Sequence, residues 1–171
     1  METADPVHHI TIVPRGRSLG TTWSLPGEEK SHLTRNEMMD DIVGLLGGRA
    51  AEEIVFDDIS TGASNDIDRA SETARDMVAR YGMSKRIGTV SYHSEDEVFI
   101  GGSYGKTRSY SEHVAGQIDE EVKAVIDAAY DRCTAILTQH RDKLDAVAEF
   151  LLKHESMTGE QFRAVMEGTN E

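Results

Sequence analysis

The sequence predicts a single, mainly α-helical domain of 171 residues with a small β-sheet near its N-terminus. Two observations indicate helices: apolar residues recur every three or four positions through the central and C-terminal parts, and capping sequences precede two of these stretches. A third observation, β-branched residues at rough period two near the N-terminus, indicates strands. We therefore expect a sheet and loop over residues 1–33, two core helices over 34–84, a loop over 85–110, and C-terminal helices over 111–171.

The expected sheet begins with Val7-His-His-Ile-Thr-Ile-Val13, which alternates roughly and ends at Pro14. Residues 16–24 form a second, weaker extended stretch that Pro26-Gly27 closes. Proline and glycine favour turns, so the two stretches together predict a small sheet.

The first core helix is expected to start at the capping box Thr34-Arg-Asn-Glu37. The Gly47-Gly48 pair inside it costs on the order of 2 kcal/mol relative to alanines, which predicts that another backbone passes close to it. Its apolar stripe consists of Met38, Ile42, Leu45, Leu46, Ala50 and Ile54.

The second core helix is expected to be capped by Ser64 or Asn65 and to end at Gly82. Asp66 and Asp68 favour the positive end of its dipole. Its predicted buried face consists of Ile67, Ala70, Ala74, Met77 and Tyr81.

Residues 85–110 are rich in glycine, serine and tyrosine, and they predict a loop with one short strand at Val98-Phe-Ile100. The pattern becomes helical again from Ser111. We expect a long helix through Ile136, another through Leu152, and a short last helix capped by Thr158-Gly-Glu-Gln161.

Composition excludes several classes of function. The net charge is −13 and no Lys/Arg cluster is present, which argues against a nucleic-acid surface. No apolar run approaches the ~18–20 residues of a membrane span, and the acidic start has no signal-peptide pattern. The single cysteine, Cys133, cannot form an internal disulfide and lies on an apolar helical stripe, so we expect a core residue in a reducing compartment.

Metal chemistry is not apparent from the histidines. No two of the seven lie four residues apart, and the sequence contains no His-Glu-x-x-His. That pattern places two zinc ligands and a general base on one helical face. From the residues alone, Asp66 is best interpreted as stabilising a helix N-terminus, by about 0.3–1 kcal/mol.

Three motifs occur in order: Leu45-Leu-Gly-Gly-Arg-Ala-Ala-Glu-Glu53, Thr61-Gly-Ala-Ser-Asn-Asp66 and Arg80-Tyr-Gly-Met-Ser84. Together they make the chain resemble the peptidase domain of the FtsH family, membrane-anchored AAA+ proteases that cut protein with a zinc ion. The resemblance extends from Ala4-Asp-Pro-Val-His8 to Leu152. It implies a helical FtsH-type peptidase fold.

The resemblance also implies a zinc site. Asp66, in the Asn65-Asp66 pair, matches the family's third zinc ligand. The family's His-Glu-x-x-His helix, with two histidine ligands and the glutamate base, would lie upstream, so we expect this segment alone to be inactive. Asn65 and Glu52 are candidates for hydrogen bonds that support the metal site; the alternative for Glu52 is an ordinary helix face paired with Arg49.

Ser18, Leu19, Gly20 and Thr21 correspond in the family to an edge strand beside the zinc. Such a strand can hold an extended peptide by strand addition, which suits a protease that accepts many sequences. The alternative is a plain edge strand blunted by its glycines.

The resemblance implies an ATP-dependent zinc metalloendopeptidase that degrades cytosolic and membrane proteins in protein quality control. ATP and magnesium would act only through an ATPase module upstream. The family forms hexamers, so a homo-oligomer is expected, with protein substrates and no nucleic acid. Membrane attachment would come only from N-terminal segments outside this chain, placing the parent on the cytoplasmic side, while this segment is expected to be soluble. The alternative is a non-catalytic oligomerisation platform or a naturally inactive relative.

Overall fold

A computed structural model describes residues 5–14, 20–24, 32–92, 97–100, 103–106 and 110–168. The chain divides into two compact units. The terminal unit comprises Met1–His32 and Ala135–Glu171, and the central unit comprises Leu33–Thr134. The predicted mainly α-helical class with a small N-terminal sheet is confirmed.

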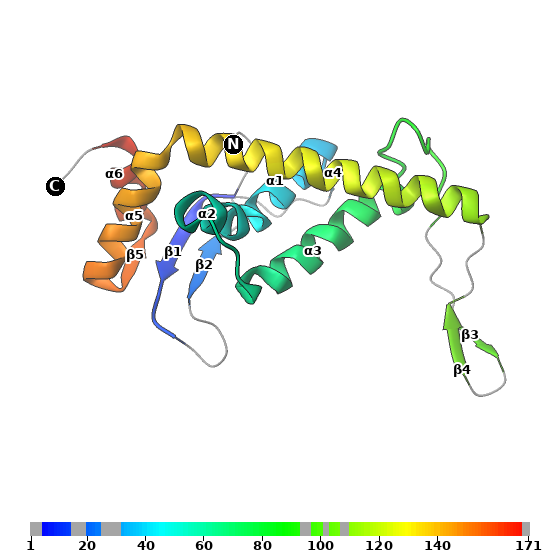
Figure 1. Cartoon of the computed structure of the whole chain (residues 1–171), viewed down its shortest axis with the longest axis horizontal. Coiled ribbons are helices and arrows are strands. Elements are labelled where there is room, and N and C mark those ends of the chain that lie inside the picture. The colour runs from blue at the N-terminus through cyan, green and yellow to red at the C-terminus, as the bar shows by residue number, and fades with distance from the viewer. Residues whose placement is uncertain are drawn as a thin grey trace. The chain divides into compact units, whose positions relative to one another are not determined.

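The terminal unit contains a three-stranded antiparallel sheet in the order β2-β1-β5 (Figure 1). β1 (Val7–Thr11) pairs with β2 (Thr21–Ser24) on one side and with β5 (Ser156–Thr158) on the other. Ile10 lies opposite Thr22 and opposite Met157. The sequence did not predict β5, because three residues are too few to show an alternating pattern.

Two helices flank β5 in the sequence: α5 (Arg141–His154) and α6 (Gly159–Glu167). Thr158 ends β5 and also caps α6, where its hydroxyl accepts a hydrogen bond from the Gln161 N–H, as predicted. Met157 is 1% exposed and belongs to the core. α6 starts directly against β1, because a Cβ on Gly159 would lie 2.3 Å from the Val7 carbonyl oxygen.

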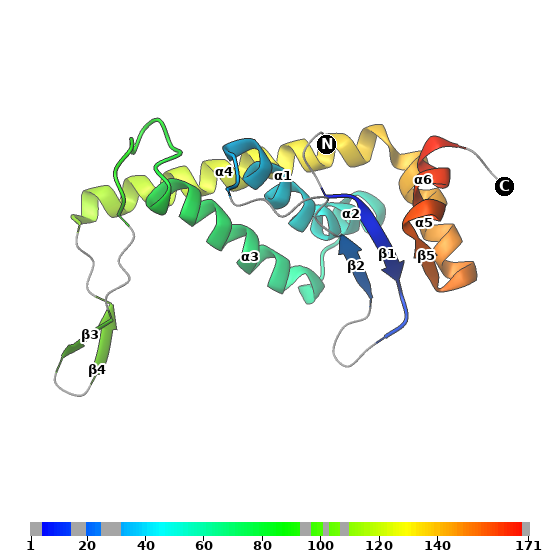
Figure 2. The same ribbon diagram turned by 180° about the vertical axis from the view of Figure 1, so that it is seen from behind.

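In the central unit the first predicted core helix is two helices, α1 (Arg35–Leu45) and α2 (Gly47–Phe56), which meet at Leu46 (Figure 2). The capping box of Thr34 and Glu37 is confirmed. The expected close backbone at Gly47-Gly48 is absent: no described atom lies within 4 Å of a Cβ built on either glycine. The glycines instead lie where one helix ends and the next begins.

The second core helix also starts differently from the prediction. A 3₁₀ turn, η1 (Thr61–Ala63), leads directly into α3 (Ser64–Arg75), and Ser60 provides the cap by accepting a hydrogen bond from the Gly62 N–H. Ser64 and Asn65 therefore lie inside the helix and do not cap it. α3 continues into the π-helical turn η2 (Asp76–Arg80), and Gly82, with φ +61°, terminates it as predicted.

The buried face of this helix is smaller than predicted. Ala70, Ala74 and Met77 are buried, whereas Ile67 is 39% and Tyr81 50% exposed. Both exposed residues lie near an end of the helical stretch, where fewer neighbours cover them. Helical spacing therefore identified the face correctly but not its ends.

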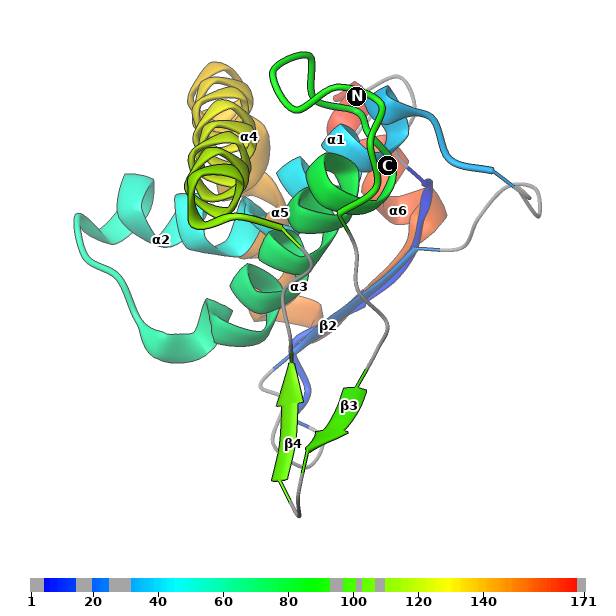
Figure 3. The ribbon, with the colours of Figure 1, turned by 90° about the vertical axis from the view of Figure 1, so that its right-hand side faces the viewer.

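The region expected to be a loop with one strand contains a hairpin of two antiparallel strands, β3 (Glu97–Ile100) and β4 (Ser103–Lys106). The long helix α4 (Glu112–Gln139) follows, as predicted. Figure 3 shows α4 almost along its axis, with α1 and α3 to one side of it. Val78 and Ala79 pack with Ile118 of α4 in a core extended by Ile87, Tyr92, Tyr110, Val114, Val122 and Val125. None of the described helices combines the length and apolar character that a membrane crossing needs.

Candidate functional site

Asp66 lies in the first turn of α3, directly after the 3₁₀ turn Thr61–Ala63. Its side chain is 46% exposed, and one carboxylate oxygen lies 3.9 Å from the Arg69 guanidinium. An exposed ion pair at that distance contributes little to stability. The carboxylate can therefore accept another cation. Asn65, beside it, is exposed.

Among the residues that the structure describes, no group of three His, Cys, Asp or Glu side chains could hold a metal ion. A catalytic zinc normally has three protein ligands. The described residues therefore do not form a zinc site by themselves, and Asp66 offers one ligand.

Glu52, on α2, holds the loop that leads to this helix. Its Oε1 accepts a hydrogen bond of 2.6 Å from the Ser60 hydroxyl, and its Oε2 accepts one of 3.0 Å from the Ser60 N–H. The Ser60 hydroxyl oxygen in turn accepts from the Gly62 N–H. These bonds, the hydroxyl bond most of all, lower the pKa of Glu52 below its ordinary value because they favour the ionised carboxylate.

Glu53, the next residue, is bonded to a different element. The Tyr130 hydroxyl of α4 donates a hydrogen bond to its carboxylate. Partial burial of the phenol, together with this bond and the nearby negative charge, raises the pKa of Tyr130 to about 12. The two adjacent glutamates of the first motif thus hold two separate parts of the central unit, a division that the sequence did not predict.

An ion pair with one buried member was not predicted from the sequence. Asp40 of α1 is 4% exposed, and its carboxylate lies 2.7 Å from the Arg132 guanidinium of α4. The only sequence signal was a carboxylate between the apolar positions Met38 and Ile42 of the same helix. Asp41 is adjacent and exposed, so this signal did not distinguish the two aspartates or identify the arginine.

Of the predicted substrate strand, Ser18 and Leu19 lie outside the described residues. Thr21 begins β2, an outer strand of the sheet in the terminal unit, and all four β2 residues are exposed. Gly20 approaches β1 closely: a Cβ there would lie 2.9 Å from the Thr11 carbonyl oxygen. Within the described sheet, Thr21 therefore lies at the start of an outer strand, and the substrate-binding role of this stretch stays a prediction.

Cys133 is buried, as predicted, and its burial raises the pKa of the thiol. A raised pKa keeps the sulfur protonated and poorly nucleophilic. Cys133 is therefore a core residue of α4.

A family model for peptidase family M41 matches residues 1–165 of this sequence. The chain belongs to peptidase family M41. It is 51% identical over 164 residues to the ATP-dependent zinc metalloprotease FtsH 1 of Thermoanaerobacter sp. (strain X514), covering 95% of this chain and 27% of that protein. It is 47% identical to the FtsH protease of Pseudothermotoga lettingae, covering 97% and 27%, and 46% identical to that of Thermotoga maritima, covering 95% and 27%.

These similarities confirm the prediction that the chain resembles the peptidase domain of the FtsH family. The match includes Asp66, Glu52 and the three motifs, since it spans residues 1–165. The chain spans about a quarter of the length of the curated relatives it matches.

Proposed function

We propose that this M41 chain is the peptidase-domain portion of an ATP-dependent zinc metalloendopeptidase, in which Asp66 is one of the zinc ligands. The position of Asp66 carries the proposal: it is a half-exposed carboxylate at the start of a helix, inside the family match, and its ion pair with Arg69 is as long as 3.9 Å. Zinc, when bound, would supply a Lewis acid that lowers the pKa of a bound water.

The other ligands, in this proposal, are the two histidines of a His-Glu-x-x-His helix that is not part of the printed sequence. Its glutamate would be the general base. One carboxylate cannot form a catalytic coordination sphere, so we expect the printed chain alone to bind no stoichiometric zinc and to cleave no protein.

Glu52 acts in this proposal by positioning. Its two hydrogen bonds to Ser60 hold the residue that caps the turn before Asp66, so the start of α3 has one defined conformation. Asn65 is proposed to support the site from the same first turn. Neither residue needs to contact the metal for this role.

We propose that the whole protein is an ATP-dependent protease, as the names of its relatives state for them. ATP and magnesium would bind an ATPase module elsewhere in that protein, and a homo-hexamer attached to the cytoplasmic side of a membrane would degrade cytosolic and membrane proteins. Residues Ser18, Leu19, Gly20 and Thr21 are proposed to hold the substrate as an added strand, which the outer position of β2 supports.

The test compares the printed chain with a form extended upstream through the expected helix. Zinc content by atomic absorption and casein cleavage are measured for both, and for Asp66→Ala and Asp68→Ala in the extended form. Asp68 is the matched control, an exposed carboxylate in the same helix. We expect the extended form to bind zinc and to cut, Asp66→Ala to lose both properties, and Asp68→Ala to keep both.

Equal zinc binding by the extended form and its Asp66→Ala variant would show that the ligand assignment is wrong. An extended form without zinc or proteolysis would reject the protease proposal and leave the oligomerisation platform.

A further inference from the structure

The central unit contains a pocket that the proposed zinc chemistry does not use. Its volume is about 440 Å³, within the roughly 300–1,000 Å³ that is typical of small-molecule sites. It lies between the start of α1, the η2 turn with the segment after it, and α4. The residues that line it are Arg35, Met77, Val78, Met83, Ser84, Lys85, Glu121 and Val125.

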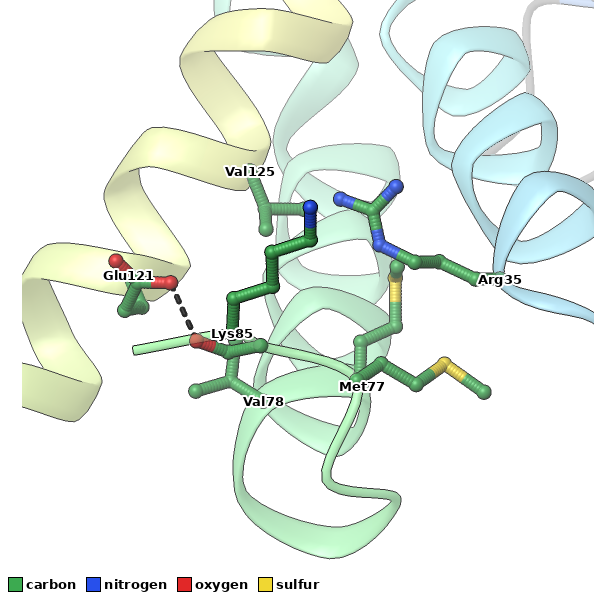
Figure 4. Close-up of a pocket in the computed structure, with 8 residues that line it drawn as sticks. Arg35, Met77, Val78, Lys85, Glu121 and Val125 are labelled. Atoms are coloured by element: carbon green, nitrogen blue, oxygen red, sulfur yellow. Dashed lines mark hydrogen bonds between the residues drawn. The ribbon is translucent and has the colours of Figure 1, made fainter. Parts of the chain in front are cut away.

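Two cations line this pocket. Arg35 is the first residue of α1, and Lys85 follows the η2 turn; Figure 4 shows both side chains extending toward the same end of the pocket, near Val125. Within the described part of the chain, neither side chain has a carboxylate partner. Two cations at one pocket make it locally attractive to an anion, although the chain as a whole carries a net charge of −13.

The one carboxylate on the wall is already bonded. Glu121 of α4 accepts a hydrogen bond from the Ser84 hydroxyl, drawn as a dashed line in Figure 4. The Ser84 oxygen also accepts from the Arg86 and Ile87 N–H groups, which holds it toward Glu121. The negative charge of Glu121 disfavours a ligand with two negative charges but tolerates one between the two cations.

The rest of the lining is apolar. Met77 and Val78 are 1% exposed, and Met83 and Val125 are partly buried. Methionine side chains adapt to ligands of different shapes, which suits an aliphatic group. A cation pair beside an apolar floor matches a molecule with a single carboxylate and a short hydrocarbon part.

We propose that this pocket binds the carboxylate of an aliphatic monoanion, with the hydrocarbon part against Met77, Val78, Met83 and Val125. Two sources share this chemistry: a free aliphatic acid, and the C-terminal carboxylate of a peptide that ends in an apolar residue. The proposal goes beyond zinc-dependent proteolysis and does not depend on it, because no lining residue is a proposed ligand of the metal.

The printed chain, labelled with ¹³C at its methionine methyl groups, is titrated separately with octanoate and with N-acetyl-Leu-Leu. Neutral counterparts, 1-octanol and the dipeptide amide, test the need for the carboxylate, and acetate, a monoanion with almost no hydrocarbon, tests the need for the hydrocarbon. We expect saturable shifts of the Met77 and Met83 signals with at least one carboxylate, and at least roughly tenfold weaker binding of its neutral counterpart and of acetate. The carboxylate that binds more tightly shows whether the natural ligand is a free aliphatic acid or the C-terminus of a peptide.

Variants test the two cations. Arg35→Gln with Lys85→Gln should weaken carboxylate binding by at least roughly tenfold. Arg86→Gln is the control, because Arg86 is adjacent in the chain but pairs with Glu120 and does not line the pocket. Circular dichroism checks that each variant is folded. If the double variant does not fold, the comparison of each carboxylate with its neutral counterpart on the unmodified chain still tests the proposal. The proposal is overturned if no carboxylate saturates the signals, if a neutral counterpart or acetate binds equally well, or if Arg86→Gln weakens binding as much as the double change.

Discussion

The carboxylate of Asp40 lies 2.7 Å from the guanidinium of Arg132, and this ion pair connects α1 with α4 inside the central unit. Asp40 is almost fully buried, whereas the Arg132 side chain is 46% exposed. A buried carboxylate that keeps its charge needs a partner, and the arginine is well placed because water still reaches it.

Arg132→Ala should lower the free energy of unfolding by about 1–3 kcal/mol, since the buried carboxylate loses a charged hydrogen-bond partner. Urea denaturation followed by circular dichroism measures the change. Arg86→Ala, which removes the exposed pair with Glu120, should change it by less than about 0.5 kcal/mol. Equal effects of the two variants would contradict a special role for the pair of Arg132 with the buried Asp40.

Glu52 should make the Ser60 loop pH-dependent. Its folded-state pKa is depressed, so its stabilising effect is present above the ordinary pKa of 4.5 and is lost as the pH falls through the folded value. Hydrogen exchange at the Ser60 amide should therefore be slow at neutral pH relative to that in Glu52→Gln. The difference should disappear in acid, as the carboxylate becomes protonated. Identical Ser60 exchange in both proteins at neutral pH would show that Glu52 does not hold the loop.

Tyr130 should ionise at a higher pH than an ordinary tyrosine, whose pKa is 10.0. Because the folded-state pKa is raised, its contribution to stability is fully present below pH 10 and is lost as the pH rises toward 12. Tyrosinate absorbance after a rapid pH jump, with the signal of Tyr130→Phe subtracted, should give a midpoint near 12. Glu53→Gln should lower this midpoint only in part, because burial is the largest cause. A midpoint near 10 in the unmodified protein would contradict both the burial of the phenol and its hydrogen bond to Glu53.

Gly159→Ala should destabilise the terminal unit by about 1–3 kcal/mol, because the new methyl group would lie 2.3 Å from the Val7 carbonyl oxygen. Urea unfolding provides the measurement. Gly116→Ala is the matched control: this glycine lies inside α4 with no described neighbour within 4 Å of its Cβ, so alanine should stabilise by about 0.5–1 kcal/mol. If Gly159→Ala is neutral, α6 does not start as close to β1 as the structure places it.

Local features could be predicted from the sequence. Both capping boxes, at Thr34 and Thr158, are present where the residue pattern indicated them, and Gly82 terminates its helix. The three motifs were sufficient to indicate the family, since their order and spacing are specific in combination. The interpretation of Asp66 as a zinc ligand stays a prediction, because it concerns partners outside the described residues.

The sequence by itself determined the helical class, the caps at Thr34 and Thr158, and the family, because each is encoded in short local patterns of residues. Only the tertiary structure decided the third strand β5, the ion pair of Asp40 with Arg132, the separate partners of Glu52 and Glu53, and the pocket lined by Arg35 and Lys85. These features join segments that are distant in the chain. A residue pattern records that a side chain is polar or apolar, but packing of the folded elements determines which distant group it meets.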